Sequence, residues 1–164
     1  MKYAHSKLRS LTIVVGLMAA FACSVSLAQG EDAIVGTWKL NLANSTYSPG
    51  PAPTSQTVKI EGTDQARKIT VDVTSATGVA LHWEVSGPGG TDLKVVGNNV
   101  NADTYVVTRV NATTLEAQYK LAGKPTLKQT AVVSADGKTL TVTGTGTNVE
   151  GQTINNVAVY DRAD

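Results

Sequence analysis

The chain has 164 residues, with 14 Lys and Arg against 13 Asp and Glu and a formal net charge of +1. This length is enough for one domain. Charges of both signs are scattered without a run of one sign, so neither nucleic acid nor an anionic membrane is expected as a partner.

The first 28 residues have the pattern of a secretory signal peptide. Lys2, Lys7 and Arg9 precede an apolar run over residues 11–21, and Ala28 ends a small-residue cleavage site. The run is shorter than the about 20 residues that an ordinary membrane-spanning helix needs. We therefore predict an exported protein, periplasmic or secreted, whose single domain is residues 29–164. Removing three of the 14 basic residues leaves 11 against 13 acidic ones.

Cys23 provides an alternative for the leader. Residues 20–23 have the form of a lipoprotein cleavage box, in which the cysteine would be acylated and become the first residue. The protein would then be anchored through Cys23. With cleavage after Ala28 instead, the mature chain has no cysteine, and its stability depends on burial and β-pairing.

The first segment after the leader that alternates cleanly is 36–42. Gly36, Trp38, Leu40 and Leu42 fall on one side of an extended chain, with polar residues between them. This pattern predicts a half-buried opening strand with Trp38 in the core. Residues 43–53 follow with three prolines, which exclude a helix and a central strand there.

The rest of the chain repeats the alternating pattern, with turn signals every 8–14 residues or so. Further strands are predicted at 56–61, 68–74, 79–86, 93–95, 104–110, 114–121, 127–133, 139–147 and 157–160. Such spacing is typical of an all-β antiparallel barrel or sandwich. Nearly all connections are tight, which favours an up-and-down β-barrel of about 8–10 strands over a sandwich with long crossovers.

No catalytic constellation is visible, so we expect that the protein is not an enzyme and needs no cofactor. Beyond the leader there is one histidine, His82, which shares a strand face with Glu84. A weak metal pair is conceivable, but a solvated polar face opposite Trp83 is the favoured interpretation, and we predict no metal site.

Two short segments carry a family resemblance. Gly36-Thr37-Trp38-Lys39-Leu40 resembles the opening strand of the calycin superfamily, the lipocalins and fatty-acid-binding proteins, and 159–162 resembles the closing strand of the latter. The resemblance implies that Arg162 packs across Trp38 and closes the barrel. The motifs GTWKLN, YSPGPAP and NNVAVYDR are also similar to small exported bacterial proteins without an assigned activity.

The sequence departs from fatty-acid-binding proteins in two places. The proline-rich stretch 48–53 stands where they have a helical lid, and Ala158 stands where they have a ligand-binding Arg.

The function predicted from the sequence is binding of a small apolar molecule in the barrel lumen. Trp83, Tyr105 and Tyr119 fall on the apolar sides of their strands. Arg109 lies on the same side of its strand as Tyr105: facing inward it could bind a carboxylate ligand, and the alternative is that it faces solvent. These four are the predicted ligand-binding residues. The alternative is a structural or protein-binding module of the cell envelope without a ligand, which would use strand edges or the proline-rich arm.

Overall fold

The structure, a computed structural model, describes residues 32–163. The predicted signal peptide and Cys23 lie outside the described residues. The elements are β1 (Gly36–Leu40), the 3₁₀ turn η1 (Leu42–Asn44), β2 (Ser55–Thr63), β3 (Ala66–Thr74), β4 (Ala80–Gly87), β5 (Leu93–Lys94), β6 (Val96–Gly97), β7 (Thr104–Asn111), β8 (Thr114–Leu121), β9 (Lys124–Val133), β10 (Thr139–Thr147) and β11 (Thr153–Arg162). No helix in this part of the chain has the length and apolarity to cross a membrane.

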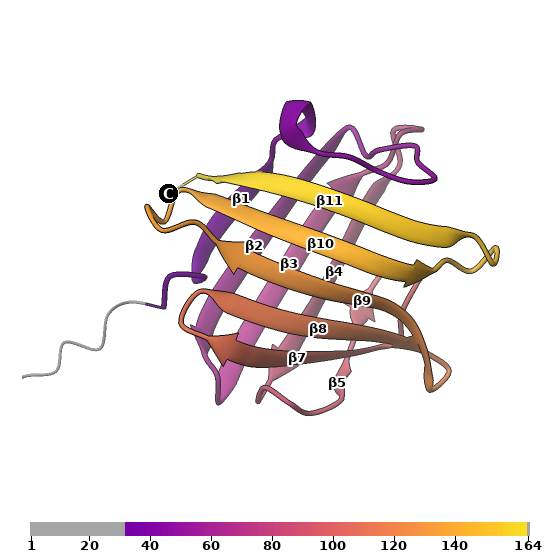
Figure 1. Cartoon of the computed structure of the whole chain (residues 1–164). Coiled ribbons are helices and arrows are strands. Elements are labelled where there is room, and N and C mark those ends of the chain that lie inside the picture. The colour runs from indigo at the N-terminus through magenta and orange to yellow at the C-terminus, as the bar shows by residue number, and fades with distance from the viewer. Residues whose placement is uncertain (1–31, 164) are drawn as a thin grey trace, which may run out of the picture.

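The strands form an antiparallel up-and-down barrel, as the sequence predicts. Their order is β5-β7-β8-β9-β10-β11-β1-β2-β3-β4-β6, in which β1–β4 and β7–β11 each follow chain order and β11 returns to β1. Strands β7–β11 cross in front of β1–β4 at a steep angle (Figure 1), so that the barrel has two opposing walls. Loops that would connect two sandwich sheets by long crossovers are not found in the described residues.

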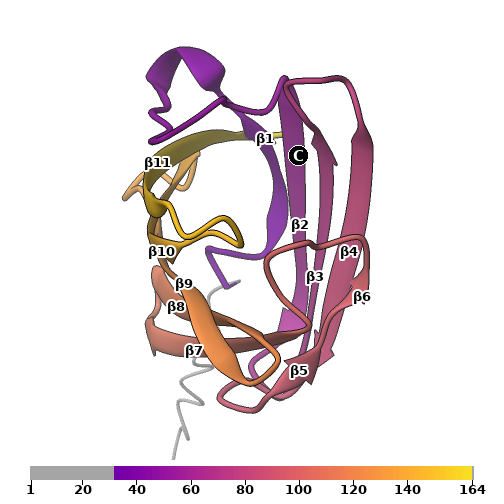
Figure 2. The ribbon, with the colours of Figure 1, turned by 90° about the vertical axis from the view of Figure 1, so that its right-hand side faces the viewer.

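The two ends of the strand order meet at one short segment of chain. β5 pairs with β7 and β6 pairs with β4, and only Val95 lies between β5 and β6 (Figure 2). The predicted strand 93–95 is therefore replaced by two short strands with different partners, since β5 pairs with β7 and, after Val95, β6 pairs with β4. Gly97 is needed here, since a Cβ at this position would lie 2.3 Å from the carbonyl oxygen of His82. This split brings the number of strands to eleven, against the about 8–10 predicted.

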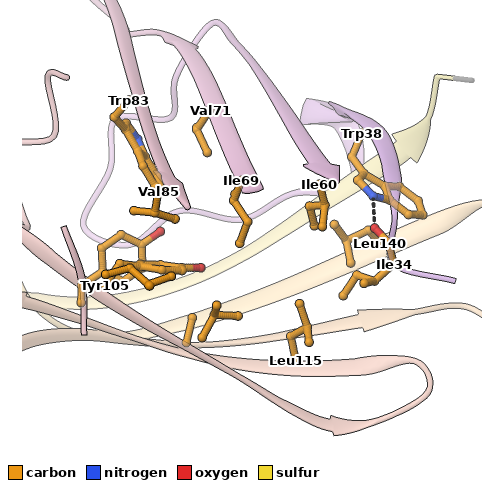
Figure 3. Packing of buried hydrophobic residues seen from close by; sticks show 14 of the residues in the cluster. Ile34, Trp38, Ile60, Ile69, Val71, Trp83, Val85, Tyr105, Leu115 and Leu140 are labelled. Carbon is orange, nitrogen blue, oxygen red and sulfur yellow. Dashed lines mark hydrogen bonds between the residues drawn. The ribbon is translucent and has the colours of Figure 1, made fainter. Parts of the chain in front are cut away.

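Alternation of burial along each strand explains why these segments pair. In β3 the buried residues are Arg67, Ile69 and Val71, and in β8 they are Leu115, Ala117 and Tyr119. Side chains on a strand point alternately to opposite faces, so one face of each strand fills the barrel and the other meets solvent. The resulting core is one apolar cluster that runs through the barrel (Figure 3).

The barrel has two different ends. At the plugged end, residues 32–35 lie across the barrel before β1, and Ile34 is completely buried. β2 and β11 end beside the start of β1, and antiparallel pairing then brings the turns 64–65, 112–113 and 134–138 to this same end. The open end has the arm 41–54 and the loops 75–79, 98–103 and 148–152.

The first strand is shorter than predicted. β1 stops at Leu40, and Asn41 then caps η1 by accepting a hydrogen bond from the Asn44 amide (3.3 Å) through its side chain. Leu42 leaves the inward row as a result and is 43% exposed. The arm that follows remains attached to the barrel through a bridge between Thr46 and Val157.

Candidate functional site

Three of the four predicted ligand-binding side chains meet inside the barrel. Trp83 comes from β4, Tyr105 from β7 and Tyr119 from β8, and all three are buried. The ring centroids of Tyr105 and Tyr119 are 4.7 Å apart, and Trp83 lies 5.9 Å and 6.0 Å from them. The tilted and edge-on packing is the arrangement that aromatic rings prefer. The register places Tyr105 opposite Tyr119, so the two tyrosines share one cross-strand pair.

Polar atoms accompany this aromatic cluster. The Tyr119 hydroxyl donates to Gln129 Oε1 (3.1 Å) on β9. Burial raises the pKa of Tyr105, of Tyr119 and of Tyr160, because the phenolate is disfavoured away from water. The three hydroxyls therefore stay protonated and can donate or accept hydrogen bonds within an otherwise apolar lumen.

An interior cavity of about 60 Å³ lies next to the aromatic cluster. Most of its walls are aliphatic or aromatic, and Gln56 and Gln129 add two amides. The lining residues are Gln56, Val58, Ile60, Ile69, Val71, Trp83, Tyr105, Val107, Leu115, Ala117, Tyr119, Gln129, Ala131, Leu140, Val142 and Tyr160. Pockets that hold drug-sized ligands have roughly 300–1,000 Å³. The cavity is apolar enough for such a ligand but too small in this arrangement of side chains.

A second hollow, the vestibule, adjoins the cavity at the open end. It has about 200 Å³ and is lined by Val73, Leu81, Leu127 and the loop residues 98–101. The vestibule shares Gln56, Trp83 and Tyr119 with the cavity. These three side chains are the partition between the lumen and the open end.

Arg109 is not brought to the other three predicted residues. It lies at the plugged end, where its Nε donates to Asp64 Oδ2 (2.7 Å) and its Nη2 pairs with Asp32. The pKa of Asp64 is lowered: partial burial alone would raise it, but hydrogen bonds from Arg109 and Arg67 outweigh that effect. In this structure Arg109 is committed to two carboxylates of the chain itself rather than to a ligand.

Trp38 and Arg162 close the plugged end together. Trp38 is completely buried, and its Nε1 donates to Ile34 O (3.0 Å) (Figure 3). The Arg162 guanidinium lies 4.2 Å above the Trp38 ring, a cation–π geometry. It also donates to Val35 O (2.9 Å), Ala33 O (2.5 Å) and Gly137 O (2.7 Å). The Trp38 and Arg162 side chains thus hold the segment 32–35 through hydrogen bonds to three of its carbonyl oxygens.

The outer face that carries His82 has ordinary surface pairs. His82 Nδ1 lies 2.7 Å from Asp72 Oδ1, and both side chains are exposed. Glu84 pairs with Lys68 (2.7 Å) on the neighbouring strand rather than with His82. No group of three or more His, Cys, Asp or Glu side chains with metal-binding geometry occurs among residues 32–163.

Sequence reasoning did not select Gln129 or Arg67, although both lie inside the barrel. Gln129 lines the cavity, and Arg67 is 2% exposed. The sequence did contain an indication of this. Each of the two residues lies an even number of positions from a buried aliphatic residue of the same strand, so its side chain points to the same, inward face.

Comparison with known proteins finds similarity among solved structures but not among sequences. No protein-family model matches the chain, and no curated protein sequence is similar to it. Among solved structures, the zebrafish ileal bile acid-binding protein complexed with cholic acid is similar, with a TM-score of 0.48 and 14% identity over 80% of this chain and 99% of that one. A similarity at this level says nothing about the function of this chain.

Proposed function

We propose that this protein is an exported β-barrel that binds a small, mainly apolar molecule in its lumen, without catalysing a reaction. The observation that carries the proposal is the apolar cavity beside the Trp83, Tyr105 and Tyr119 cluster, which is separated from the vestibule only by side chains. A cavity with apolar walls and a few convergent polar groups is the usual form of a small-molecule site.

The size of the cavity defines how binding would occur. At about 60 Å³ it accepts only a very small molecule. A larger ligand requires Trp83 and Tyr119 to turn away, which would join the cavity to the 200 Å³ vestibule. The ligand would then lie in the lumen with its end in the vestibule, and Gln56 or Gln129 would hydrogen-bond to any polar group that it carries.

The test uses two matched leucine variants. Ala117 is buried and lines the cavity, so Ala117→Leu fills the space that a ligand needs. Ala80→Leu adds the same group on an exposed position outside the cavity. The purified chain and both variants are incubated with an apolar extract and examined by native mass spectrometry. We expect a co-purifying small molecule with the unchanged chain and with Ala80→Leu, but not with Ala117→Leu.

If no molecule is retained by the unchanged chain, or if Ala117→Leu retains the same molecule as the other two, the lumen is not the binding site.

The small cavity favours a second candidate, a ligand-free protein-binding module of the cell envelope. Its surface would be the hollow of about 320 Å³ between the arm Tyr47–Pro51 and the loops that carry Val100 and Val149. These two valines are 64% and 59% exposed. A pull-down from an envelope extract tests it: the double variant Val100→Ser, Val149→Ser should lose a partner that the unchanged chain captures. Equal capture by both would exclude this surface.

A further inference from the structure

The walls of the lumen carry no charge. Aliphatic, aromatic and amide side chains line the cavity and the vestibule, and no Lys, Arg, His, Asp or Glu of the described residues is among them. Tyr105, Tyr119 and Tyr160 also remain uncharged, because burial raises the pKa of each phenol. A ligand that lies between these walls therefore contacts no ionised side chain of either sign.

The arginines of the plugged end do not supply a positive charge to the lumen. Arg67 and Arg109 are balanced by Asp32 and Asp64, with which they form four ion pairs. Arg162 donates to three backbone carbonyls and lies on an aromatic ring. None of these arginines lines the cavity or the vestibule.

Two glutamines provide polar groups inside the barrel. Gln56 is on β2 and Gln129 is on β9, so they come from the two opposing walls (Figure 1). Gln129 accepts from the Tyr119 hydroxyl through Oε1, which leaves its Nε2 without a partner in the part of the chain that the structure describes. The Gln56 side chain makes no hydrogen bond within this part either.

Both amides are accessible to a ligand. Over residues 32–163, the fully buried polar side-chain atoms without a hydrogen-bond partner are Tyr47 Oη and Arg67 Nη1. Gln56 and Gln129 are half-buried and are not in this group, so their unpaired amide atoms retain accessible surface. Gln129 lines the cavity, and Gln56 lines both the cavity and the vestibule. A ligand that extends from one space into the other would contact Gln56.

The absence of charge on these walls limits the class of ligand. A carboxylate or an ammonium group would lose its hydration in the lumen without gaining an ion-pair partner, which strongly disfavours the charged form. A hydroxyl or carbonyl oxygen loses much less, because one hydrogen bond from an amide compensates for its burial. The walls therefore favour a neutral ligand over an ionised one.

We propose that the lumen selects an uncharged lipophilic molecule with a hydroxyl or carbonyl oxygen, and that it rejects fatty acids and other organic ions. The oxygen accepts a hydrogen bond from the amide of Gln56 or Gln129, and the apolar body packs among the aliphatic and aromatic walls. This inference rests on the proposed function, because it specifies the ligand of the same lumen.

The test compares three probes of equal chain length, 1-octanol, octanoate and octylammonium, by isothermal titration calorimetry of the purified chain at about pH 7.5. We expect 1-octanol to bind at least about tenfold more tightly than either ion. Acidification to about pH 5.5 should raise the apparent affinity for octanoate about tenfold per pH unit, because only the protonated acid binds and its fraction rises by that factor. The affinity for 1-octanol should not change, since no titratable group that lines the lumen changes its charge in this range.

Two pairs of variants complete the test. Ala117→Leu fills the cavity and should weaken 1-octanol binding, whereas Ala80→Leu, outside the cavity, should not. Gln56→Lys places a cation between the cavity and the vestibule and should raise octanoate affinity at about pH 7.5 at least about tenfold. Gln56→Met, which is uncharged, should not raise it. Neither change at Gln56 removes a side-chain hydrogen bond from the described chain.

The outcomes separate this inference from the proposed function. If neither 1-octanol nor octanoate binds, or if Ala117→Leu leaves 1-octanol binding unchanged, both are overturned. If octanoate binds the unchanged chain as tightly as 1-octanol at about pH 7.5, and Ala117→Leu blocks it, the lumen binds an ion and this inference alone is overturned. An octanoate affinity that does not rise on acidification would also overturn it. The probe and pH comparisons need no substitution at Gln56, so they hold even if a Gln56 variant does not fold.

Discussion

Replacement of Trp38 by Ala is the most direct test of how the plugged end is held. The side chain is completely buried, makes one hydrogen bond through Nε1 and carries the Arg162 guanidinium on its ring. Truncating a buried Trp to Ala costs about 3–5 kcal/mol. For a domain of this size, that loss corresponds to a fall in the melting temperature of roughly 10–20 °C.

A matched variant separates the contribution of the Nε1 hydrogen bond from the rest of this loss of stability. Trp38→Phe retains an aromatic ring under Arg162 but removes the Nε1 donor, leaving Ile34 O without that hydrogen bond. An unsatisfied buried group costs about 1–3 kcal/mol, so Trp38→Phe should fall between the unchanged chain and Trp38→Ala. Truncation of Arg162 should cost less than Trp38→Ala, because its guanidinium is only partly buried.

Urea unfolding followed by far-UV circular dichroism measures these free energies, and the fluorescence of Trp83 gives a second probe. The slope of the unfolding free energy against urea should remain unchanged, so that the midpoint alone reports stability. A double variant, Trp38→Ala with Arg162→Met, should cost less than the sum of the single losses because the two side chains are in contact. An unchanged midpoint for Trp38→Ala would refute the reasoning.

Three further predictions concern the tyrosines, one carboxylate and two glycines. All four described tyrosines have a pKa raised above 10.0 by burial, so their contribution to stability should be constant below about pH 10 and be lost above it; the tyrosinate absorbance should then rise together with unfolding, and a separate rise before unfolding would contradict this. The lowered pKa of Asp64 contributes stability above its unfolded value near 3.8 that is lost as the pH falls through the folded value, so the urea midpoint of Asp64→Asn should vary less with pH on the acid side than that of the unchanged chain. A Cβ on Gly146 would lie 2.1 Å from Thr126 O, whereas one on Gly144 finds its nearest neighbour at 3.5 Å; Gly146→Ala should therefore cost about 1–3 kcal/mol in thermal or urea unfolding, and equal stability of the two variants would be the contrary result.

Most of the fold could be predicted from alternation. One face of each strand is buried and the other is not, so apolar residues recur at every second position. This alternation predicts, within a few residues of their observed bounds, β2, β3, β4, β7, β8, β9 and β10. The predicted end of the first strand at Leu42 was wrong, because Asn41 caps a 3₁₀ turn although the apolar pattern continues to Leu42. A side-chain cap competes locally with the strand, and apolar periodicity does not register it.

The site was less predictable than the fold. Trp83, Tyr105 and Tyr119 line one lumen, in agreement with their positions on the apolar sides of their strands, but the same parity allowed a lumen position for Arg109 as well. Whether a residue is at an odd or even position of a strand determines which face its side chain is on, but not its position along the barrel axis. Arg109 lies near the plugged end, and the two carboxylates that bind it come from the segment before β1 and from the turn after β2. Pairing between such distant segments leaves no local pattern in the sequence.

The contrast between the two ends of the barrel bears on where a ligand can enter. At the plugged end, hydrogen bonds from Trp38 and Arg162 hold the segment 32–35, with the buried Ile34, across the lumen. At the open end, only side chains separate the cavity from the vestibule, and Val100 in the loop above is 64% exposed. Opening the plugged end breaks buried hydrogen bonds, whereas opening the other end requires rotation of aromatic rings. Entry through the open end is therefore the less costly route, and a ligand larger than the cavity would have to displace both Trp83 and Tyr119.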